Sequence, residues 1–357
     1  MSEQVIHHRT PEFEKILLET WAGLKSVFKT VQPVQILAGT GTAAMEAAVV
    51  NTLSPMDDVL VVVSGKFGER WAEQCEQYQV NTIRWNVHWG SPASLKDFEA
   101  QLKANPQIKA VFTQACETST ATIHPIREMI ELTRMHTRAI FCVDAITAAG
   151  CMNLPMDEWG IDVMVAGSQK AFMIPTGLSF IAMSERAWAT ATESAIPKFY
   201  LDLQAEKAAN ERKETHFSTP TSLVVGLNAV LKRIQEKGLD QVMRRCEVLA
   251  ESTRWAGERL GLPAYSQAPS SSVTALITPE GVNSAKIRES LEKEKGITIM
   301  GGQDELKGKI LRIGHMGDVR DDDMVALFDA LAGAFGKPFD FEPELRQRLA
   351  KAPTLFE

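Results

Sequence analysis

The sequence predicts an α/β fold in which a mostly parallel central sheet is covered by helices and followed by a smaller α+β domain. Five short apolar runs have the length and composition of strands buried on both faces: Val59–Val63, Ile108–Thr113, Ala139–Val143, Val163–Ala166 and Leu178–Met183. Segments with helical spacing alternate with these runs, at Ala43–Leu53, Gly68–Gln79, Pro92–Ala104 and Ile126–Met135. This alternation is typical of parallel sheets, which bind ligands at the carboxyl ends of their strands.

The pattern changes from about Thr221. Two long helices are predicted at Leu223–Glu236 and Leu239–Leu260, and their charges, such as Arg244 and Arg245, predict a solvated face. Strands at Ser272–Ile277 and Lys309–Ile313 and helices near Ser284–Glu294 and Asp322–Phe335 complete a smaller α+β unit. We therefore expect an N-terminal arm over residues 1–15, a large domain over 16–240 and a small C-terminal domain over 241–357.

Composition limits the possible partners. The chain has 357 residues, 45% of them hydrophobic, and a net charge of −7 from 38 Lys+Arg against 45 Asp+Glu. Without a basic block we expect no nucleic-acid partner, and without an apolar run of about 18 residues we expect no membrane span. The N-terminus lacks the apolar core of a signal peptide. Five cysteines without a CxxC pair and scattered histidines predict a cytoplasmic protein with reduced thiols and no metal site.

A Gly/Thr-rich turn, Gly39-Thr-Gly-Thr-Ala-Ala44, lies between an apolar run and a helix. It fits the G-x-G-x-x-A pattern of an NAD site, but the next strand ends in Val63-Ser64-Gly65 without the expected acid. Such a turn also presents N–H groups and hydroxyls to a single phosphate. Alternatively, Thr40 and Thr42 only cap the helix.

Two further loops follow strands. In Ser64-Gly-Lys-Phe-Gly68, the glycines predict that Phe67 lies on an exposed bend, where it either stacks on a flat ring or packs locally. Cys116-Glu-Thr-Ser-Thr120 is rich in hydroxyls, which face a ligand or satisfy their own backbone.

Two charged residues end buried strands. Asp144 follows Phe-Cys-Val and stays ionised only beside a cation or a hydrogen-bond donor, unless it is a helix cap. Lys170 ends another strand and precedes an apolar segment, where burial lowers the pKa of an amine and favours a Schiff base, unless it reaches solvent. A carboxylate for a ring nitrogen, a lysine for an aldehyde and an anion-binding turn are the three anchors of pyridoxal 5′-phosphate (PLP).

The stretch from Val143-Asp144 to Gly167-Ser-Gln-Lys170 resembles the class V aminotransferases, most closely their alanine/serine–glyoxylate branch. Further blocks resemble the family in the same order: Gly39–Glu46, Phe67-Gly-Glu-Arg70, Glu117-Thr-Ser-Thr120 and Leu311–Gly317. The resemblance implies PLP fold type I and a homodimer with active sites at the subunit interface. Three features depart from the family pattern: the early start of the chain, Phe217 in place of a tyrosine, and Ala121 in place of a glycine.

The same resemblance implies a role for each matching residue. Lys170 corresponds to the Schiff-base lysine, Asp144 to the partner of the ring nitrogen, and Arg312 to the residue that binds the substrate carboxylate. Phe67 and Ile146 would pack on the two ring faces, and Thr118 would approach the ring hydroxyl. The phosphate would be held by Thr40, Gly41, Thr42 and Gln169, with Ser218 or Thr219 reaching the phosphate of the neighbouring subunit.

The implied activity is transfer of an amino group from alanine or serine to glyoxylate or pyruvate. Four alternatives remain: a transaminase with a ureidoglycine, aminophosphonate or pyridoxamine donor, a cysteine-desulfurase-like lyase, an NAD-dependent oxidoreductase, and a non-catalytic subunit. A desulfurase needs a reactive cysteine late in the chain, and none follows Cys246.

Overall fold

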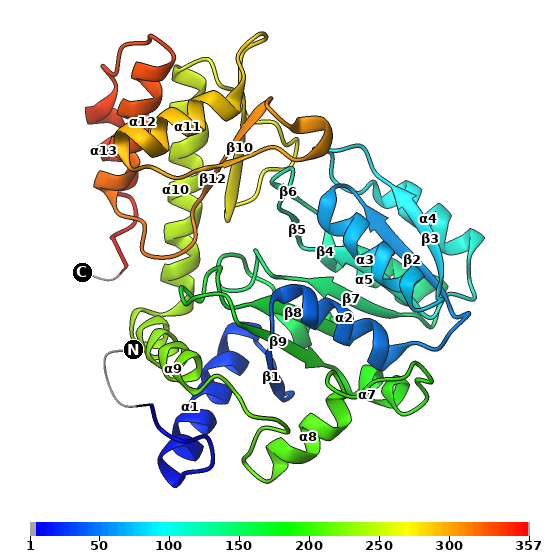
Figure 1. Ribbon diagram of the computed structural model, residues 1–357. Helices are drawn as coiled ribbons and strands as arrows, with labels where there is room; N and C mark the ends of the chain where they lie inside the picture. Colours follow the sequence, from blue (N-terminus) through cyan, green and yellow to red (C-terminus); the bar gives the residue numbers. More distant parts are fainter. Residues whose placement is uncertain (1–4, 356–357) are drawn as a thin grey trace.

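The computed structural model describes residues 5–355, which form two units joined by a long helix (Figure 1). The larger unit contains a seven-stranded sheet in the order β1-β9-β8-β7-β4-β2-β3. Its strands are β1 (Val34–Ala38), β2 (Asp58–Val63), β3 (Asn81–Asn86), β4 (Ala110–Gln114), β7 (Ile140–Asp144), β8 (Val163–Gly167) and β9 (Leu178–Met183). The five strands predicted from apolar runs all form, and each lies inside this sheet.

The sheet is mostly parallel, as predicted. Neighbouring strands from β3 to β8 run in the same direction, whereas β9 is antiparallel to both β8 and β1. Ten residues, 168–177, connect β8 to β9, and this is shorter than the crossover that a parallel pair needs. The carboxyl ends of β1, β2, β4, β7 and β8 therefore lie at one edge of the sheet.

Helices cover both faces because the strand residues alternate between two cores. Leu60 and Val62 of β2 belong to one core, and Val59, Val61 and Val63 to the other. The first core packs under α1 (Pro11–Phe28), α4 (Leu95–Ala104), α5 (Ile126–His136), α6 (Met156–Trp159) and α9 (Thr221–Lys237). The second packs under α2 (Gly41–Thr52), α3 (Lys66–Gln77), α7 (Glu185–Ala191) and α8 (Leu203–Glu211).

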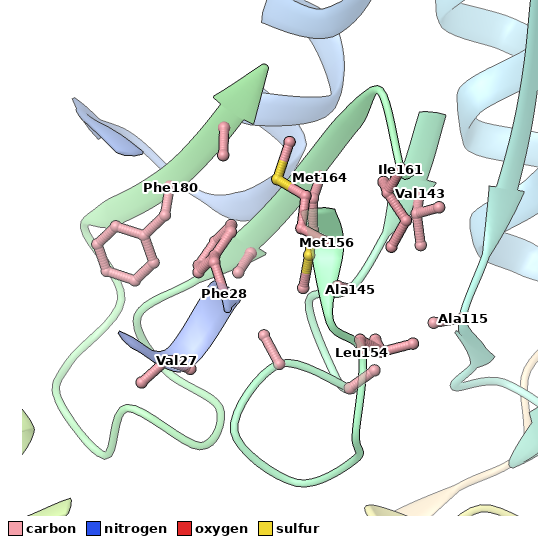
Figure 2. Packing of buried hydrophobic residues seen from close by; sticks show 14 of the residues in the cluster. Val27, Phe28, Ala115, Val143, Ala145, Leu154, Met156, Ile161, Met164 and Phe180 are labelled. Carbon is pink, nitrogen blue, oxygen red and sulfur yellow. The ribbon is translucent and has the colours of Figure 1, made fainter. Parts of the chain in front are cut away.

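The end of α1 contributes to the first core. Figure 2 shows Val27 and Phe28 of this helix beside Phe180 of β9, with Met164 of β8 close by. The Thr10 hydroxyl caps α1 by accepting a hydrogen bond from the Phe13 N–H (3.3 Å). The predicted limit of an N-terminal arm at residue 15 falls inside this helix, and residues 1–4 of that arm lie outside the described part of the chain.

The smaller unit packs a short sheet against helices. Its elements are α10 (Leu239–Arg259), β10 (Val273–Ile277), α11 (Ser284–Lys295), β11 (Met300–Gly301), the 3₁₀ turn η1 (Asp304–Leu306), β12 (Ile310–Gly314), α12 (Asp321–Ala334) and α13 (Glu342–Leu349). The hairpin of β5 (Cys116–Glu117) and β6 (Thr122–Ile123) extends from the large unit toward it (Figure 1). The domain boundary proposed at residue 240 falls in the first turn of α10.

Arg245 corrects the expectation of a solvated face on α10. Its side chain is fully buried, and Nη2 donates to Asp321 Oδ1 (2.7 Å) and to the Val319 carbonyl (2.9 Å). Nη1 donates to the carbonyl of Ala352 (3.0 Å). Asp321 is 33% exposed, so the buried partner in this ion pair is Arg245 alone. The spacing of apolar residues predicted the helix. It did not show that segments near Val319 and Ala352 cover the side of the helix that carries Arg245.

Between residues 5 and 355, no helix combines the length and apolar character that crossing a membrane requires. In the same part of the chain, all five cysteines are buried free thiols. No group of three or more His, Cys, Asp or Glu side chains in this described part has the arrangement of a metal site.

Candidate active site

The start of α2 forms part of the carboxyl edge of the sheet. The Gly39 N–H donates to the Gly177 carbonyl (2.9 Å), which joins this turn to the start of β9. Thr40 occupies the N-cap position, but its hydroxyl makes no capping hydrogen bond. The alternative in which the Thr40 side chain caps the helix is therefore wrong, and the start of α2 keeps backbone N–H groups that could bind an anion.

Gly41 allows neighbouring groups to approach this turn closely. A Cβ atom at residue 41 would lie 2.5 Å from Ile146 Cδ1, so a larger residue there would force the Ile146 side chain to move. A Cβ atom at Gly167 would lie 3.2 Å from Gln169 Oε1 and 3.6 Å from the Gly41 backbone nitrogen. The fold thus brings Gly41, Ile146 and Gln169 together, as the sequence predicted. Thr40 and Gln169 are exposed in the single chain.

Asp144 is the last residue of β7 and is 5% exposed. Burial, with a smaller contribution from the charge of Glu117, raises the pKa of its carboxyl to about 7. A hydrogen bond from the Ile146 N–H to Oδ1 (2.8 Å) and the charges of Lys170 and Arg70 oppose this rise. A buried carboxylate with so few donors is stabilised in its ionised form by a cation, and the protonated pyridine nitrogen of PLP is a suitable one.

Lys170 lies within electrostatic range of both Asp144 and Arg312, because the charge of each of them shifts its pKa. Its side chain is half-buried, and burial lowers the pKa of the amine. The positive charge of Arg312 lowers that pKa as well, while Asp144 raises it. The predicted lysine and carboxylate therefore lie at the same edge of the sheet, and the lowered pKa shifts the Lys170 amine toward its uncharged form.

Arg312 extends from β12 of the small unit to the large unit. Nη1 donates to the Thr118 carbonyl (2.9 Å), and Nε donates to the Gly301 carbonyl (2.8 Å). The Thr118 hydroxyl lies 2.9 Å from the Thr147 hydroxyl, in the loop that follows Asp144. These hydrogen bonds hold the guanidinium between the two units and leave the two Nη2 hydrogens available for a carboxylate.

Phe67 does not lie on an exposed bend, contrary to the expectation from the flanking glycines. It is half-buried in the first turn of α3, which begins at Lys66 rather than at Gly68. The buried Glu117 carboxylate accepts hydrogen bonds from the N–H groups of Phe67 (3.1 Å) and Gly68 (3.1 Å). The Ser119 hydroxyl accepts one from the Lys66 N–H (3.1 Å).

Glu117 and Ser119 therefore cap α3 from a different loop. Gly65, the local N-cap residue, has no side chain for this task, and a Cβ atom there would lie 2.4 Å from Ser119 Oγ. Both residues belong to the block Glu117-Thr-Ser-Thr120 that resembles the family, but their role as caps of α3 was not predicted. A cap supplied from fifty residues away has no local signal, so helical spacing placed the start of α3 too late.

Ser218 and Thr219 are not joined to the start of α2 in the single chain. They lie beside β1 in a small hollow that Phe217 and Tyr200 also line. Ser218 is exposed, and the buried Thr219 hydroxyl has no hydrogen-bond partner in the described part of the chain. The Tyr200 ring stacks on Phe217 with a centroid distance of 4.9 Å, so a phenol hydroxyl is present near the position where Phe217 lacks one.

The structure explains why glycine would suit position 121. Ala121 has a φ of +60° and is 1% exposed, at the tip of the β5–β6 hairpin. Its carbonyl accepts a hydrogen bond from the Ser270 N–H (3.0 Å), which holds this left-handed backbone in place. A left-handed conformation costs a non-glycine residue about 1–2 kcal/mol.

Similarity to known proteins agrees with this geometry. The family model for aminotransferase class-V matches residues 2–316. A soluble hydrogenase small subunit of Synechococcus sp. (strain PCC 6716) is 40% identical over 93% of this chain and 87% of its own length. An L-aspartate–glyoxylate aminotransferase of Paracoccus denitrificans is 33% identical over 88% of this chain and 82% of its own. A serine–glyoxylate aminotransferase of Methylorubrum extorquens is 31% identical over 94% and 85%.

A solved structure extends the likeness to the fold. The ureidoglycine–glyoxylate aminotransferase of Bacillus subtilis superposes with a TM-score of 0.92 at 27% identity, covering 98% of this chain and 93% of the other. The architecture is that of PLP fold type I, as the resemblance implied. From the match of its sequence over residues 2–316 and from this fold, the chain belongs to the class V aminotransferases, which depend on PLP.

Proposed function

We propose that this aminotransferase takes its amino group from alanine or serine and passes it to glyoxylate or pyruvate. The observation that carries the proposal is the face of the small sheet that holds Arg312, where its paired neighbours Ala275 and Met300 are apolar. Arg312 binds one carboxylate, and a small side chain needs no second charge. A dicarboxylic donor such as aspartate needs another cation beside the first.

Arg288, whose charge acts on Arg312, lies on the other face of the small sheet. Met300 pairs with Arg312, and Gly301 pairs with Leu311, so the two pairs point to opposite faces. Leu311 belongs to the core beneath the helices. A Cβ atom at Gly301 would lie 2.9 Å from Arg288 Nη1, which puts Arg288 on this helical face. On the face of Arg312, the half-exposed Met300 offers an apolar side chain instead.

The remaining roles follow the same geometry. Bound PLP supplies an aldehyde that joins amines and a ring that withdraws electrons from the adjacent carbon. Lys170 Nζ takes the proton from the substrate Cα, and burial together with the charge of Arg312 favours this role because both lower the pKa of the amine. Asp144 holds a proton on the ring nitrogen, and Arg312 orients the substrate carboxylate.

Contacts with the cofactor involve the residues collected at the sheet edge. Phe67 and Ile146 would pack on the ring, and Thr118 would meet the ring hydroxyl. Thr40, Gly41, Thr42 and Gln169 would hold the phosphate. The exposure of Thr40, Gln169 and Ser218 in the single chain supports a homodimer in which Ser218 or Thr219 completes the phosphate site of the partner.

A donor panel tests this proposal. Alanine, serine, aspartate, ureidoglycine, an aminophosphonate and pyridoxamine are each supplied with glyoxylate and with pyruvate, and kcat/KM is compared. We expect alanine or serine to give the highest value. A higher value for aspartate, or for any of the other three donors, would contradict the proposed donor class.

Replacing Arg312 with lysine tests the carboxylate site. Lysine keeps the charge but loses the planar pair of donors, so the KM for alanine should rise by about 10- to 100-fold. Arg288→Gln is the matched control, because it removes a nearby charge from the other face. We expect it to leave the KM for alanine within about twofold. A rise in the control equal to that in Arg312→Lys would show that the two faces are assigned wrongly.

The similarity to a protein named as a hydrogenase subunit favours one second candidate, a subunit that kept the fold for binding a partner. A binding role requires neither a buried carboxylate beside a lysine nor an arginine held between the units. Transamination by the purified chain alone distinguishes the two candidates. Complete inactivity of the PLP-loaded chain with every donor of the panel would favour the subunit.

A further inference from the structure

Arg70 contacts two of the proposed cofactor residues, Phe67 and Thr42, and its charge acts on a third, Asp144. It follows Phe67 by three positions on α3, so the two side chains are neighbours on the helix surface. The guanidinium carbon lies 4.8 Å from the centre of the Phe67 ring. Nη1 donates to the Thr42 hydroxyl oxygen (3.2 Å), and the charge lowers the pKa of Asp144.

The position of Arg70 relative to α2 is well defined. Trp71 Nε1 donates to the Met45 carbonyl (3.1 Å), and Gln74 Nε2 donates to the Thr42 carbonyl (3.1 Å). Together with the bond from Arg70, these contacts join one face of α3 to the first two turns of α2. Because the Thr42 hydroxyl accepts a hydrogen bond from Arg70, its own hydrogen remains free to donate to an anion.

The charge of a phosphate at this helix start is not balanced by the residues assigned so far. A phosphate ester carries about −1.5 to −2 charges at neutral pH, while the start of a helix contributes only about half a positive charge. Thr40, Thr42 and Gln169 are neutral. A side-chain cation at the start of α2 would supply the missing charge.

The other cations at this edge already have partners or proposed tasks. Lys66 Nζ forms ion pairs with two carboxylates, at 3.0 and 3.1 Å. Arg312 binds two backbone carbonyls and is the proposed substrate arginine, and Lys170 is the proposed aldehyde-binding amine. By contrast, no acidic oxygen among residues 5–355 forms an ion pair within 4.0 Å of Arg70.

We propose that Arg70 supplies positive charge to the phosphate of PLP while it covers the outer side of the Phe67 ring. This inference rests on the proposed function, because it takes the phosphate to lie at the start of α2. Arg70 then strengthens the binding of PLP through its contact with the phosphate group rather than through the pyridine ring.

The test compares PLP with pyridoxal, which has the same ring and aldehyde but no phosphate. The apoprotein is titrated with each compound, and the ratio of the two dissociation constants is determined by absorbance. Arg70→Gln should raise the dissociation constant of PLP by about 10- to 100-fold, as expected for the loss of a charge-assisted hydrogen bond. The constant for pyridoxal should change by about twofold at most. The ratio does not depend on the folded fraction, because both compounds bind the same protein sample.

Three further variants separate charge from packing. Arg70→Lys keeps the charge, so its ratio should stay within about fivefold of the parental ratio. Phe67→Leu removes the ring and should weaken both compounds by a similar factor. Arg84→Gln is the matched control. Arg84 lies on the edge strand β3 and forms an ion pair with Glu76 of α3, so this substitution should change neither dissociation constant.

If Arg70→Gln has the same ratio of PLP to pyridoxal dissociation constants as the parent protein, the inference is overturned. This holds whether both constants change by the same factor or neither changes. A parent apoprotein that bound PLP without involving Lys170 would instead refute the proposed function, and the inference with it. Normal PLP binding at Lys170 with an unchanged ratio in Arg70→Gln would refute the inference alone.

Discussion

Replacing Lys170 with alanine should lower kcat for transamination by at least about 10³-fold, as expected when a residue that transfers the proton is lost. The reason is the site of Lys170, which lies beside Asp144 and Arg312 and has an amine whose pKa is lowered by burial. Lys66, another lysine at this edge, is instead paired with two carboxylates. The rate is measured with alanine and glyoxylate at saturating PLP.

Two controls accompany this variant. Lys109→Ala removes an exposed lysine next to β4 and should leave kcat unchanged. Added methylamine should partly restore the Lys170→Ala rate if the missing group is a proton-transferring amine. A Lys170→Ala protein that transaminates at the parental rate would show that the lysine is assigned wrongly.

Replacing Asp144 with asparagine should lower kcat by about 10²–10³-fold, the range for removing one electrostatic contact from a reacting group. Asparagine has the same shape but cannot hold the ring nitrogen in its protonated form. An unchanged kcat would mean that no charge is needed at this position. Asp144→Glu keeps the charge and should retain more activity than the asparagine variant.

The same variant should change how the stability of the apoprotein depends on pH. Burial raises the folded-state pKa of Asp144 to about 7, above its usual value of 3.8. Between about pH 4 and pH 7 the unfolded chain therefore loses a proton that the folded chain keeps, and the free energy of unfolding falls as pH rises. The expected fall is on the order of 4 kcal/mol. It is measured as the difference between urea unfolding of the parent and of Asp144→Asn, and parallel profiles would contradict it.

The fold could be predicted largely because buried strands have a simple sequence pattern. Val59–Val63 and Leu178–Met183 are apolar on both faces, and the structure places both inside the sheet. The edge strand β3 was missed because Asn81 and Arg84 give it a mixed, half-exposed pattern. The reversed direction of β9 was also missed, since apolar content carries no information about strand direction.

The candidate site could be predicted where each residue follows directly after a strand or a helix start. Asp144 ends β7, and Lys170 lies three residues beyond the end of the neighbouring strand β8, so both residues lie at one edge of the sheet. The contacts of Phe67 were predicted less well, because Glu117 and Ser119 cap its helix from another loop. Arg70 was missed for a similar reason, since its partner Thr42 lies 28 residues away in the chain.

The central claim is that Lys170 is the amine that binds the cofactor aldehyde. Its most direct test is borohydride reduction of the PLP-loaded protein, followed by proteolysis and mass spectrometry of the peptides. The account predicts loss of the visible absorption band and a single cofactor-modified peptide, with the added mass on Lys170. Modification of a different lysine, or an unmodified Lys170 peptide after the band has disappeared, would contradict it.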